Sequence, residues 1–262
     1  MLKIRTIINK EWAEVFKNRL VLFTVLFMPL LFTLIPLLML YFTRSSQGSD
    51  VLGTLPEQIT NLCQQNGSPD NCFQYYLLSQ FIVLFMLLPV IIPVNIAAYS
   101  IVGEKTTHSL EPLLATPITT AQLLIGKNLA AALPAILATW VSYTLFALGA
   151  YLLTFSVSLI RMILDPLWLI AVLVIGPLLS ILAVNFAIMV SSRVTDPRVA
   201  EQLSVVVILP ILLLMFGQIA GIVILNRGLM LLLGLGVLVV DAILIPLAIN
   251  MFQRESILTR WK

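Results

Sequence analysis

Histidine, cysteine and charged side chains are scarce in this 262-residue sequence. It contains one histidine, His108, and two cysteines, and only 10% of its residues are charged, against roughly 25% in a soluble domain. His108 lies outside every long apolar stretch, so no serine or cysteine in those stretches has a histidine to activate it as a nucleophile. Asp241 is the only acidic residue within such a stretch, which excludes a pair of catalytic aspartates there. No active site is predicted in the apolar part of the chain.

Motifs for metals and nucleotides are also missing. The sequence has no HExxH zinc motif. It has no phosphate-binding GxxxxGK[ST] loop either, because Gly126-Lys127 is followed by Asn128 and Ala121 stands where the first glycine would be. We therefore expect no metal, no cofactor and no enzymatic activity in this chain. Any ATP that drives it, with its Mg²⁺, is expected in another subunit.

Six long apolar stretches account for most of the sequence, which is 60% hydrophobic. Each contains at least the ~20 residues that an α-helix needs to cross a ~30 Å hydrocarbon layer. They cover residues 20–42, 75–98, 129–154, 167–190, 203–225 and 229–250. The expected fold is an all-α membrane protein, with six transmembrane helices in a single domain of residues 20–262. Glycines in the last two stretches leave open that one of them is a re-entrant segment.

Positive charge is distributed unevenly between the segments that join these stretches. With six crossings, twelve of the fifteen Lys and Arg residues fall on one side: Lys3, Arg5, Lys10, Lys17, Arg19, Lys105, Lys127, Arg193, Arg198, Arg254, Arg260 and Lys262. The other side has only Arg44, Arg161 and Arg227. Because basic segments stay in the cytoplasm, we expect a multi-pass protein of the cytoplasmic (inner) membrane with both termini cytoplasmic. The net charge of +3 reflects this arrangement, so nucleic acid is not an expected partner.

Residues 1–19 are predicted to form an amphipathic helix before the first stretch. At 100° per residue, Ile4, Ile8 and Trp12 fall within an arc of about 80°, and the lysines lie outside it. Such a helix suits the headgroup region of membrane lipid. Glu11, however, falls about 20° from Ile4, within the apolar stripe, where a carboxylate is costly against lipid. We therefore expect this face to pack against protein, and Glu11 to contact a hydrogen-bond donor on a cytoplasmic helix.

The first extracytoplasmic loop, residues 43–74, contains both cysteines. Disulfides form in that compartment, and the eight residues between Cys63 and Cys72 make a loop short enough to close. We predict a disulfide between them, with two free thiols as the alternative. The fifth loop, Asn226-Arg227-Gly228, is predicted to be a tight turn by its composition.

The second cytoplasmic connection, residues 99–127, is the most polar part of the chain and is predicted to form two short helices. The first continues the second transmembrane helix. Its charged and apolar residues are Glu104, Lys105, Leu110, Glu111, Leu113 and Leu114. Pro117 ends this helix, because the residue before a proline is disfavoured in helical geometry.

The second of these helices is predicted to begin at Thr119, which forms a capping box with Gln122. It contains the apolar pair Leu123 and Leu124 and is expected to stop at Gly126. A short helix across the mouth of a helix bundle is a part that a second protein can push.

This connection resembles the signature of ABC type-2 exporter permeases. The residues that carry the resemblance run from Gly103 to Lys127 as G-E-K-x-x-x-S-L-E-x-L-L-A-T-P-I-T-x-x-x-L-L-I-G-K. The opening of the chain, with Lys10-Glu11 before Lys17-Asn18-Arg19 and a proline-containing first span, is similar to the same family. The likeness is nearest to its sodium-efflux and drug-efflux branch, and in layout it covers the whole chain.

The resemblance implies a permease dimer, of identical or paralogous subunits, that is docked on two ABC ATP-binding subunits. Glu104 to Leu114 would then form the gate helix, Pro117 to Ile125 the coupling helix and residues 3–18 the elbow helix. Pro112 departs from the family pattern, where a helix former is usual, so the gate helix is expected to kink or restart there. The first extracytoplasmic loop is also smaller than the ectodomains of some sodium-efflux relatives.

Two further features concern the path of a substrate. Pro89 and Pro93 lie just before the polar connection and are expected to let the second helix bend. Asp241 lies near the bilayer midplane, where a charge costs at least ~2.5–3.5 kcal/mol. Two interpretations of Asp241 remain open. It contacts a cation or cationic substrate in the translocation path, or it is protonated and hydrogen-bonds to neighbours such as Asn185 or Gln218.

We therefore expect a permease subunit that moves a substrate outward when a separate ATP-binding subunit hydrolyses ATP. An ion-coupled transporter or channel is one alternative, although Asp241 alone supplies charge within the spans. A non-transporting assembly or sensor subunit with the same architecture is another. The substrate is not predicted, because a lipid, an amphipathic drug, a peptide or a small ion suits six apolar helices equally.

Overall fold

The computed structural model describes residues 2–43, 69–106, 118–154, 157–223 and 225–251. Every regular element in these ranges is helical. Along the chain they are α1 (Leu2–Val15), α2 (Arg19–Thr43), α4 (Pro69–Thr106), α6 (Thr120–Thr154), α7 (Val157–Ile163), α8 (Pro166–Leu169), the π-helix η2 (Ile170–Ile175), α9 (Gly176–Arg193), α10 (Pro197–Ser204), the 3₁₀-helix η3 (Val205–Ile208), α11 (Leu209–Ile219) and α12 (Arg227–Met251).

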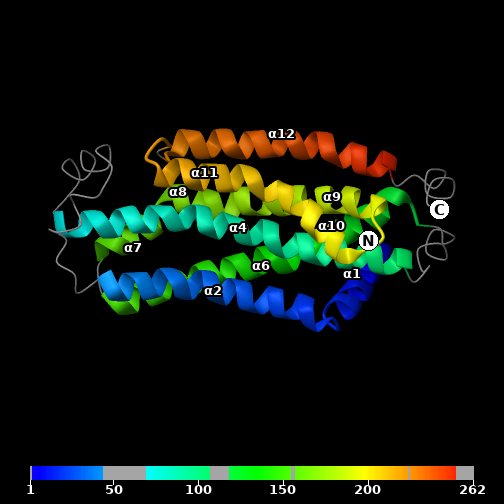
Figure 1. Cartoon of the computed structure of the whole chain (residues 1–262), viewed down its shortest axis with the longest axis horizontal. Helices are drawn as coiled ribbons and strands as arrows, with labels where there is room; N and C mark the ends of the chain where they lie inside the picture. The colour runs from blue at the N-terminus through cyan, green and yellow to red at the C-terminus, as the bar shows by residue number, and fades with distance from the viewer. Residues whose placement is uncertain (1, 44–68, 107–117, 155–156, 224, 252–262) are drawn as a thin grey trace.

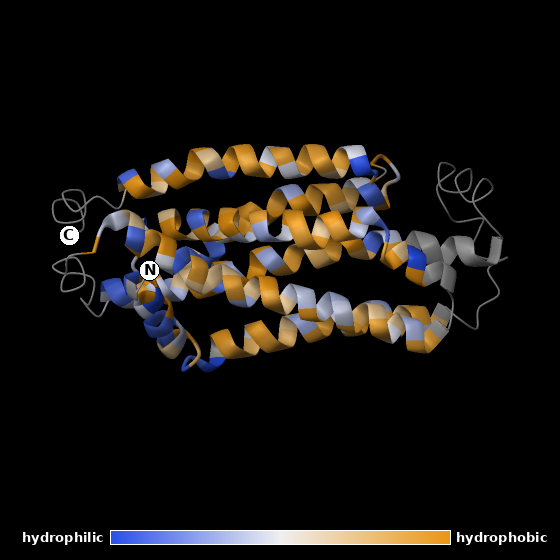
Figure 2. Ribbon diagram, turned by 180° about the vertical axis from the view of Figure 1, so that it is seen from behind, coloured by the Kyte–Doolittle hydropathy of each residue, from blue (hydrophilic) through white to orange (hydrophobic). Residues whose placement is uncertain are grey.

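The six predicted crossings are confirmed by helices of sufficient length and apolarity within the described ranges. They comprise Val21–Phe42, Leu78–Thr106, Thr120–Leu153, Ile160–Arg193, Pro197–Ile219 and Arg227–Met251. All six run along the long axis of the bundle, so α1 and the last turn of α12 lie at the same end (Figure 1). We call this the α1 end. Hydropathy colouring shows apolar residues along the middle of the helices and hydrophilic ones gathered at the α1 end (Figure 2).

Helix α4 forms the centre of the bundle, and 89% of its most apolar window is buried inside the protein. Aromatic rings pack around it where α4, α6 and α8 meet. The Phe85 ring lies 5.3 Å from that of Phe146, and the Trp168 ring stacks on Phe146 at 6.0 Å between centroids. Offset and stacked rings at these distances add to the apolar area that they bury. The core is therefore built on α4, with aromatic side chains fixing its contacts.

The outer helices present apolar side chains to their surroundings. Only 22% of the corresponding window of α2 and 11% of that of α12 is buried within the chain. A soluble protein rarely leaves apolar faces of this extent in water, whereas a membrane protein exposes them to lipid. This contrast between a covered α4 and uncovered outer helices identifies a multi-pass membrane bundle.

Helices α4 and α6 are longer than the bilayer requires. With 38 and 35 residues they extend about 57 and 52 Å at ~1.5 Å per residue, against a ~30 Å hydrocarbon layer. At the α1 end both continue into polar sequence, to Thr106 in α4 and from Thr120 in α6. The third transmembrane helix thus begins well before the predicted position of residue 129.

The predicted stop at Gly126 is wrong, because α6 runs through it without a break. The capping box is confirmed, since the backbone N–H of Thr119 donates to the Gln122 side chain and that of Gln122 donates to the Thr119 hydroxyl. Gly126 does not end the helix but allows α1 to pack closely against α6. A Cβ at this position would lie 2.8 Å from Cγ2 of Ile7 on α1. The sequence expected to form a separate two-turn helix is therefore the first part of α6.

The last two spans, Pro197–Ile219 and Arg227–Met251, are each long and apolar enough for a full crossing, so neither requires a re-entrant segment. After α11 the chain turns through Gly221, whose φ of 72° favours glycine, and the N–H groups of Ile222 and Val223 donate to the carbonyl of Gly217. The predicted tight turn at Asn226-Arg227-Gly228 is wrong. Arg227 and Gly228 lie in the first turn of α12, and the Asn226 side chain accepts the N–H of Leu229 at 2.7 Å.

Candidate functional site

Four charged side chains from three helices meet at the α1 end. The Lys127 ammonium on α6 lies 2.8 Å from a carboxylate oxygen of Glu11 on α1 and 2.8 Å from one of Glu104 on α4. Lys10 on α1 lies 2.6 Å from the other Glu104 oxygen. We call Lys10, Glu11, Glu104 and Lys127 the charge cluster. Its two carboxylates balance its two ammonium groups.

Hydrogen bonds from Ser100 on α4 complete the charge cluster. The Ser100 hydroxyl donates to the second carboxylate oxygen of Glu11 and accepts a hydrogen bond from Lys127 at 2.8 Å. Glu11, Glu104 and Lys127 are all buried, with 4% exposure at most. Burial makes an unpaired charge costly, and here each charge has an opposite neighbour and hydrogen bonds. The donor expected to contact Glu11 is therefore present, as Lys127 together with Ser100.

Apolar and backbone contacts hold the rest of α1 against α6. The Trp12 indole N–H donates to the backbone carbonyl of Ala130 at 2.9 Å. Ile7 is buried where it meets the glycine surface at Gly126. The apolar face of α1 thus packs on protein, as Glu11 indicated. Helices α1, α4 and α6 are connected at this end by polar and apolar contacts together.

The residues predicted to contact an ATPase divide into two groups. Leu110, Glu111, Leu113, Leu114 and Pro117 lie outside the described residues. Glu104, Leu123 and Leu124 are described and are buried within the chain. Lys105 donates to the backbone carbonyls of Ser192 and Val194, each at 3.3 Å, and so connects the end of α4 to the end of α9.

Asp241 and the two α4 prolines lie deep in the bundle. Asp241 is 5% exposed, and neither of its carboxylate oxygens has a hydrogen-bond partner among the described residues. The two neighbours considered for it bond elsewhere: Asn185 accepts from Asn128, and Gln218 donates to the backbone of Ser79.

Pro89 and Pro93 are buried, and α4 remains helical through both of them. Pro89 faces Gly176, at the start of α9, where an added Cβ would lie 3.7 Å from its ring. The predicted disulfide stays a prediction, because Cys63 lies outside the described residues and only the backbone of Cys72 is described. No group of three metal-ligating side chains occurs in the described part of the chain.

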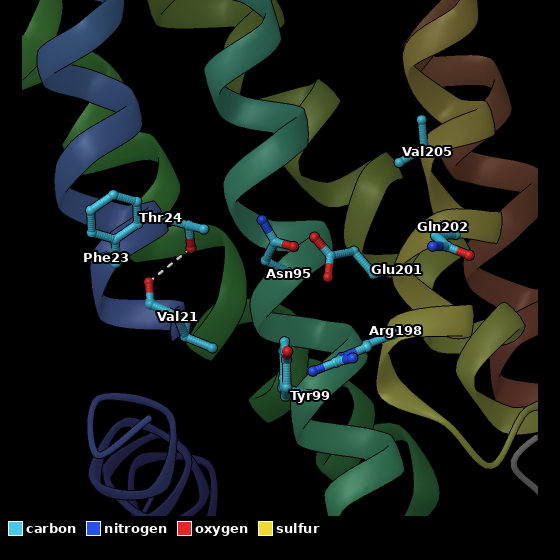
Figure 3. Close-up of a pocket in the computed structure, with 9 residues that line it drawn as sticks. All are labelled: Val21, Phe23, Thr24, Asn95, Tyr99, Arg198, Glu201, Gln202 and Val205. Atoms are coloured by element: carbon cyan, nitrogen blue, oxygen red, sulfur yellow. Dashed lines mark hydrogen bonds between the residues drawn. The ribbon is translucent and has the colours of Figure 1, made fainter. Parts of the chain in front are cut away.

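A pocket of about 470 Å³ opens between α2, α4 and α10, close to the α1 end (Figure 3). Its lining residues are Val21, Phe23, Thr24, Asn95, Tyr99, Arg198, Glu201, Gln202 and Val205. The Glu201 carboxylate points across the pocket to Asn95, and the Arg198 side chain extends towards Tyr99. The pocket therefore combines three apolar residues with six that have polar or charged groups, and such groups fix the orientation of a bound molecule in small-molecule sites.

Comparison with known proteins decides the class of protein. Residues 5–252 match the family described as ABC-2 family transporter protein, which is nearly the whole chain. The chain belongs to this ABC-2 transporter family. No curated protein matches the chain.

Family membership assigns the bundle its general role. An ABC-2 transporter protein of this kind is the transmembrane permease subunit of an ABC transporter, and the family implies an ABC ATP-binding partner. The resemblance found in the sequence is thus confirmed at the level of the family. Assignment to the sodium-efflux and drug-efflux branch stays a prediction.

Several polar residues of this ABC-2 permease were not singled out from its sequence. Lys127 was noted as a positive charge and as the last residue of the family signature, yet a lysine next to Gly126 and inside an apolar run is also a candidate for a buried partner of Glu11. Asn95 is a single amide in the apolar stretch 81–98. Glu201 lies three residues after Arg198, so that both lie on one face of α10. The position of each of these residues along its helix is a signal that the sequence contains. The residues that they face on other helices are visible only in the structure.

Proposed function

We propose that the chain is the permease subunit of an ATP-driven exporter that moves its substrate outward across the cytoplasmic membrane. It works as a dimer, with ATP and Mg²⁺ bound in a separate ABC ATP-binding subunit. The observation that carries this proposal is the ABC-2 family match over residues 5–252. The geometry of the α1 end supports it, because α4 and α6 extend there beyond the length that a bilayer needs.

The proposed coupling passes through the segment between these two helices. Residues 107–119 join the end of α4 at Thr106 to the start of α6 at Thr120, so a partner that displaces this segment acts on both helices. The charge cluster connects both helices to α1 by ion pairs. Movement of the segment is therefore transmitted to α1, α4 and α6 as a group. Within α4, Pro89 and Pro93 supply positions at which the helix can bend.

The proposed orientation places the α1 end in the cytoplasm, with both termini there. Among the described residues, Lys10, Lys105, Lys127, Arg193 and Arg198 lie towards this end, and Arg161 and Arg227 towards the other. This distribution agrees with the rule that basic segments remain cytoplasmic. ATP-binding subunits work in the cytoplasm, so this orientation places the 107–119 segment on their side of the membrane.

The proposal is tested with the chain and its ATP-binding subunit purified together and reconstituted into vesicles. We expect the chain to raise the ATPase rate of its partner. Glu111→Ala combined with Leu114→Ala should remove most of this stimulation, because both residues belong to the predicted contact surface. Arg161→Ala, at the opposite end, is the matched control and should leave stimulation unchanged. Transport that proceeds without ATP and stops in Asp241→Asn would instead favour an ion-coupled transporter.

A further inference from the structure

The pocket between α2, α4 and α10 contains polar groups with unused hydrogen-bonding capacity. Asn95 lines it, is only 5% exposed and has no side-chain hydrogen bond in the described part of the chain. Glu201 is half-buried beside Asn95 and forms no ion pair with any described residue. Buried or half-buried polar groups normally have partners in folded proteins. A bound molecule would supply them here.

We infer that this pocket binds an amphipathic cation, a molecule with a protonated amine and an apolar body. This inference rests on the proposed function, because it names the substrate class of the transporter. The Glu201 carboxylate and the Asn95 carbonyl oxygen both accept hydrogen bonds and lie on facing helices, α10 and α4. An ammonium group has up to three N–H donors and the opposite charge to Glu201, so it satisfies both residues at once.

The rest of the lining fits an apolar body. Val21 and Phe23 on α2 and Val205 on η3 form the walls, and Phe23 and Val205 are 55% and 44% exposed towards the surroundings of the bundle. A volume of about 470 Å³ lies within the ~300–1,000 Å³ range of small-molecule sites. Because Val21, Phe23 and Glu201 lie in the first two turns of their spans at the α1 end, the pocket lies near one boundary of the membrane. An amphiphile dissolved in that leaflet reaches it directly.

Arg198 is the second charged residue at the pocket, and its environment bears on whether the bound molecule is a cation or an anion. Its side chain is exposed and extends towards Tyr99, away from Glu201 and Asn95. An exposed guanidinium remains solvated and needs no counter-ion, whereas the half-buried carboxylate gains more from one. The structure therefore favours a positively charged head group at Glu201.

The test measures head-group selectivity in the full chain, held in nanodiscs of phosphatidylcholine. The probes are three fluorescent C12 chains that differ only in the terminal group: a primary amine, an alcohol and a carboxylate. Binding is followed by fluorescence anisotropy, with empty nanodiscs used to subtract partition into lipid. We expect the amine to bind about tenfold more tightly than the alcohol and the carboxylate to bind most weakly.

Two substitutions at the pocket change its charge in opposite directions. Glu201→Gln should weaken amine binding about tenfold and leave alcohol binding unchanged. Gln202→Glu adds a carboxylate at an exposed lining position and should tighten amine binding, so the test does not depend on Glu201→Gln folding well. Glu14→Gln removes an exposed carboxylate of α1, away from the pocket, and is the matched control with no expected effect.

Equal binding of the amine and the alcohol would overturn the inference, as would preference for the carboxylate probe. Absence of any binding, because a second copy of the chain fills the pocket, would also overturn it. The ATPase rate of the complex is measured on the same preparations. A chain that stimulates ATPase without head-group selectivity keeps the proposed function and loses only the inference. A chain that binds the amine probe selectively but stimulates no ATP-binding subunit keeps the cation-binding pocket and loses the proposed function.

Discussion

Lys127 is a central residue of the charge cluster, because its ammonium group contacts both carboxylates. Ion pairs on protein surfaces contribute little, typically 0 to ~1 kcal/mol. Removing one member of a buried pair is different, since the remaining charge loses its partner without regaining water. The cluster is therefore better understood as a requirement for α1 to dock on α4 and α6 than as a source of excess stability.

The substitution Lys127→Met tests this interpretation of the cluster. It leaves Glu11 with the Ser100 hydroxyl as its one side-chain partner among the described residues, and we expect the free energy of unfolding to fall by about 3–5 kcal/mol. Unfolding is measured by titration with sodium dodecyl sulfate in mixed micelles. Adding Glu11→Gln to Lys127→Met should recover part of the loss, because it removes the uncompensated charge.

The control for this experiment is Lys17→Met, which removes an exposed lysine from the same end of the protein. We expect it to change the free energy of unfolding by no more than about 0.5 kcal/mol. Equal effects of Lys17→Met and Lys127→Met would show that the charge cluster does not hold α1 in place.

At the scale of elements, the junction of α1 and α6 depends on a glycine that allows two helices to approach closely. A Cβ at Gly126 would lie 2.8 and 3.0 Å from Cγ2 and Cβ of Ile7. Cβ of a β-branched residue cannot move aside by rotating a side-chain torsion. Any side chain at position 126 therefore pushes α1 away from α6.

Two glycine-to-alanine substitutions at the same end separate packing from helix propensity. Alanine stabilises a helix interior by about 0.8–1 kcal/mol relative to glycine, and a Cβ at Gly103 meets nothing within 4 Å. Gly103→Ala should therefore raise the free energy of unfolding, whereas Gly126→Ala should lower it despite the same propensity gain. Combining Gly126→Ala with Ile7→Ala should reduce the clash. A stabilising effect of Gly126→Ala alone would contradict the close packing.

The elements show which parts of the fold are visible in the sequence. Long apolar stretches, the amphipathic α1 and the capping box at Thr119 and Gln122 are local signals, and all three were predicted. The continuation of α6 through Gly126 was missed because a glycine after a short helix indicates a stop as readily as a close contact. Glu11 signalled that it needed a partner, but its partner Lys127 lies 116 positions away. Pairing over that distance follows from how the helices pack and not from local pattern.

At the scale of the whole molecule, the six crossings establish that α1 and the end of α12 share one side, and the orientation stays a prediction. We expect a membrane-impermeant maleimide to label Arg161→Cys in intact cells and to label Lys17→Cys only after the cells are opened. Both substitutions are made with Cys63 and Cys72 replaced by serine. Labelling of Lys17→Cys from outside would reverse the orientation, and with it the side on which an ATP-binding subunit docks.

The contrast between a covered α4 and a nearly uncovered α12 has a consequence for how this sequence can change over time. In the apolar part of α4 the buried side chains fit against several neighbouring helices, so a substitution there must be matched by others. On the outer face of α12, apolar residues can replace one another, because they contact lipid and not a fitted protein neighbour. Variation among natural variants should accordingly accumulate along α12, leaving the inward-facing Met230, Gly234, Asp241 and Ala248 as its most constrained positions.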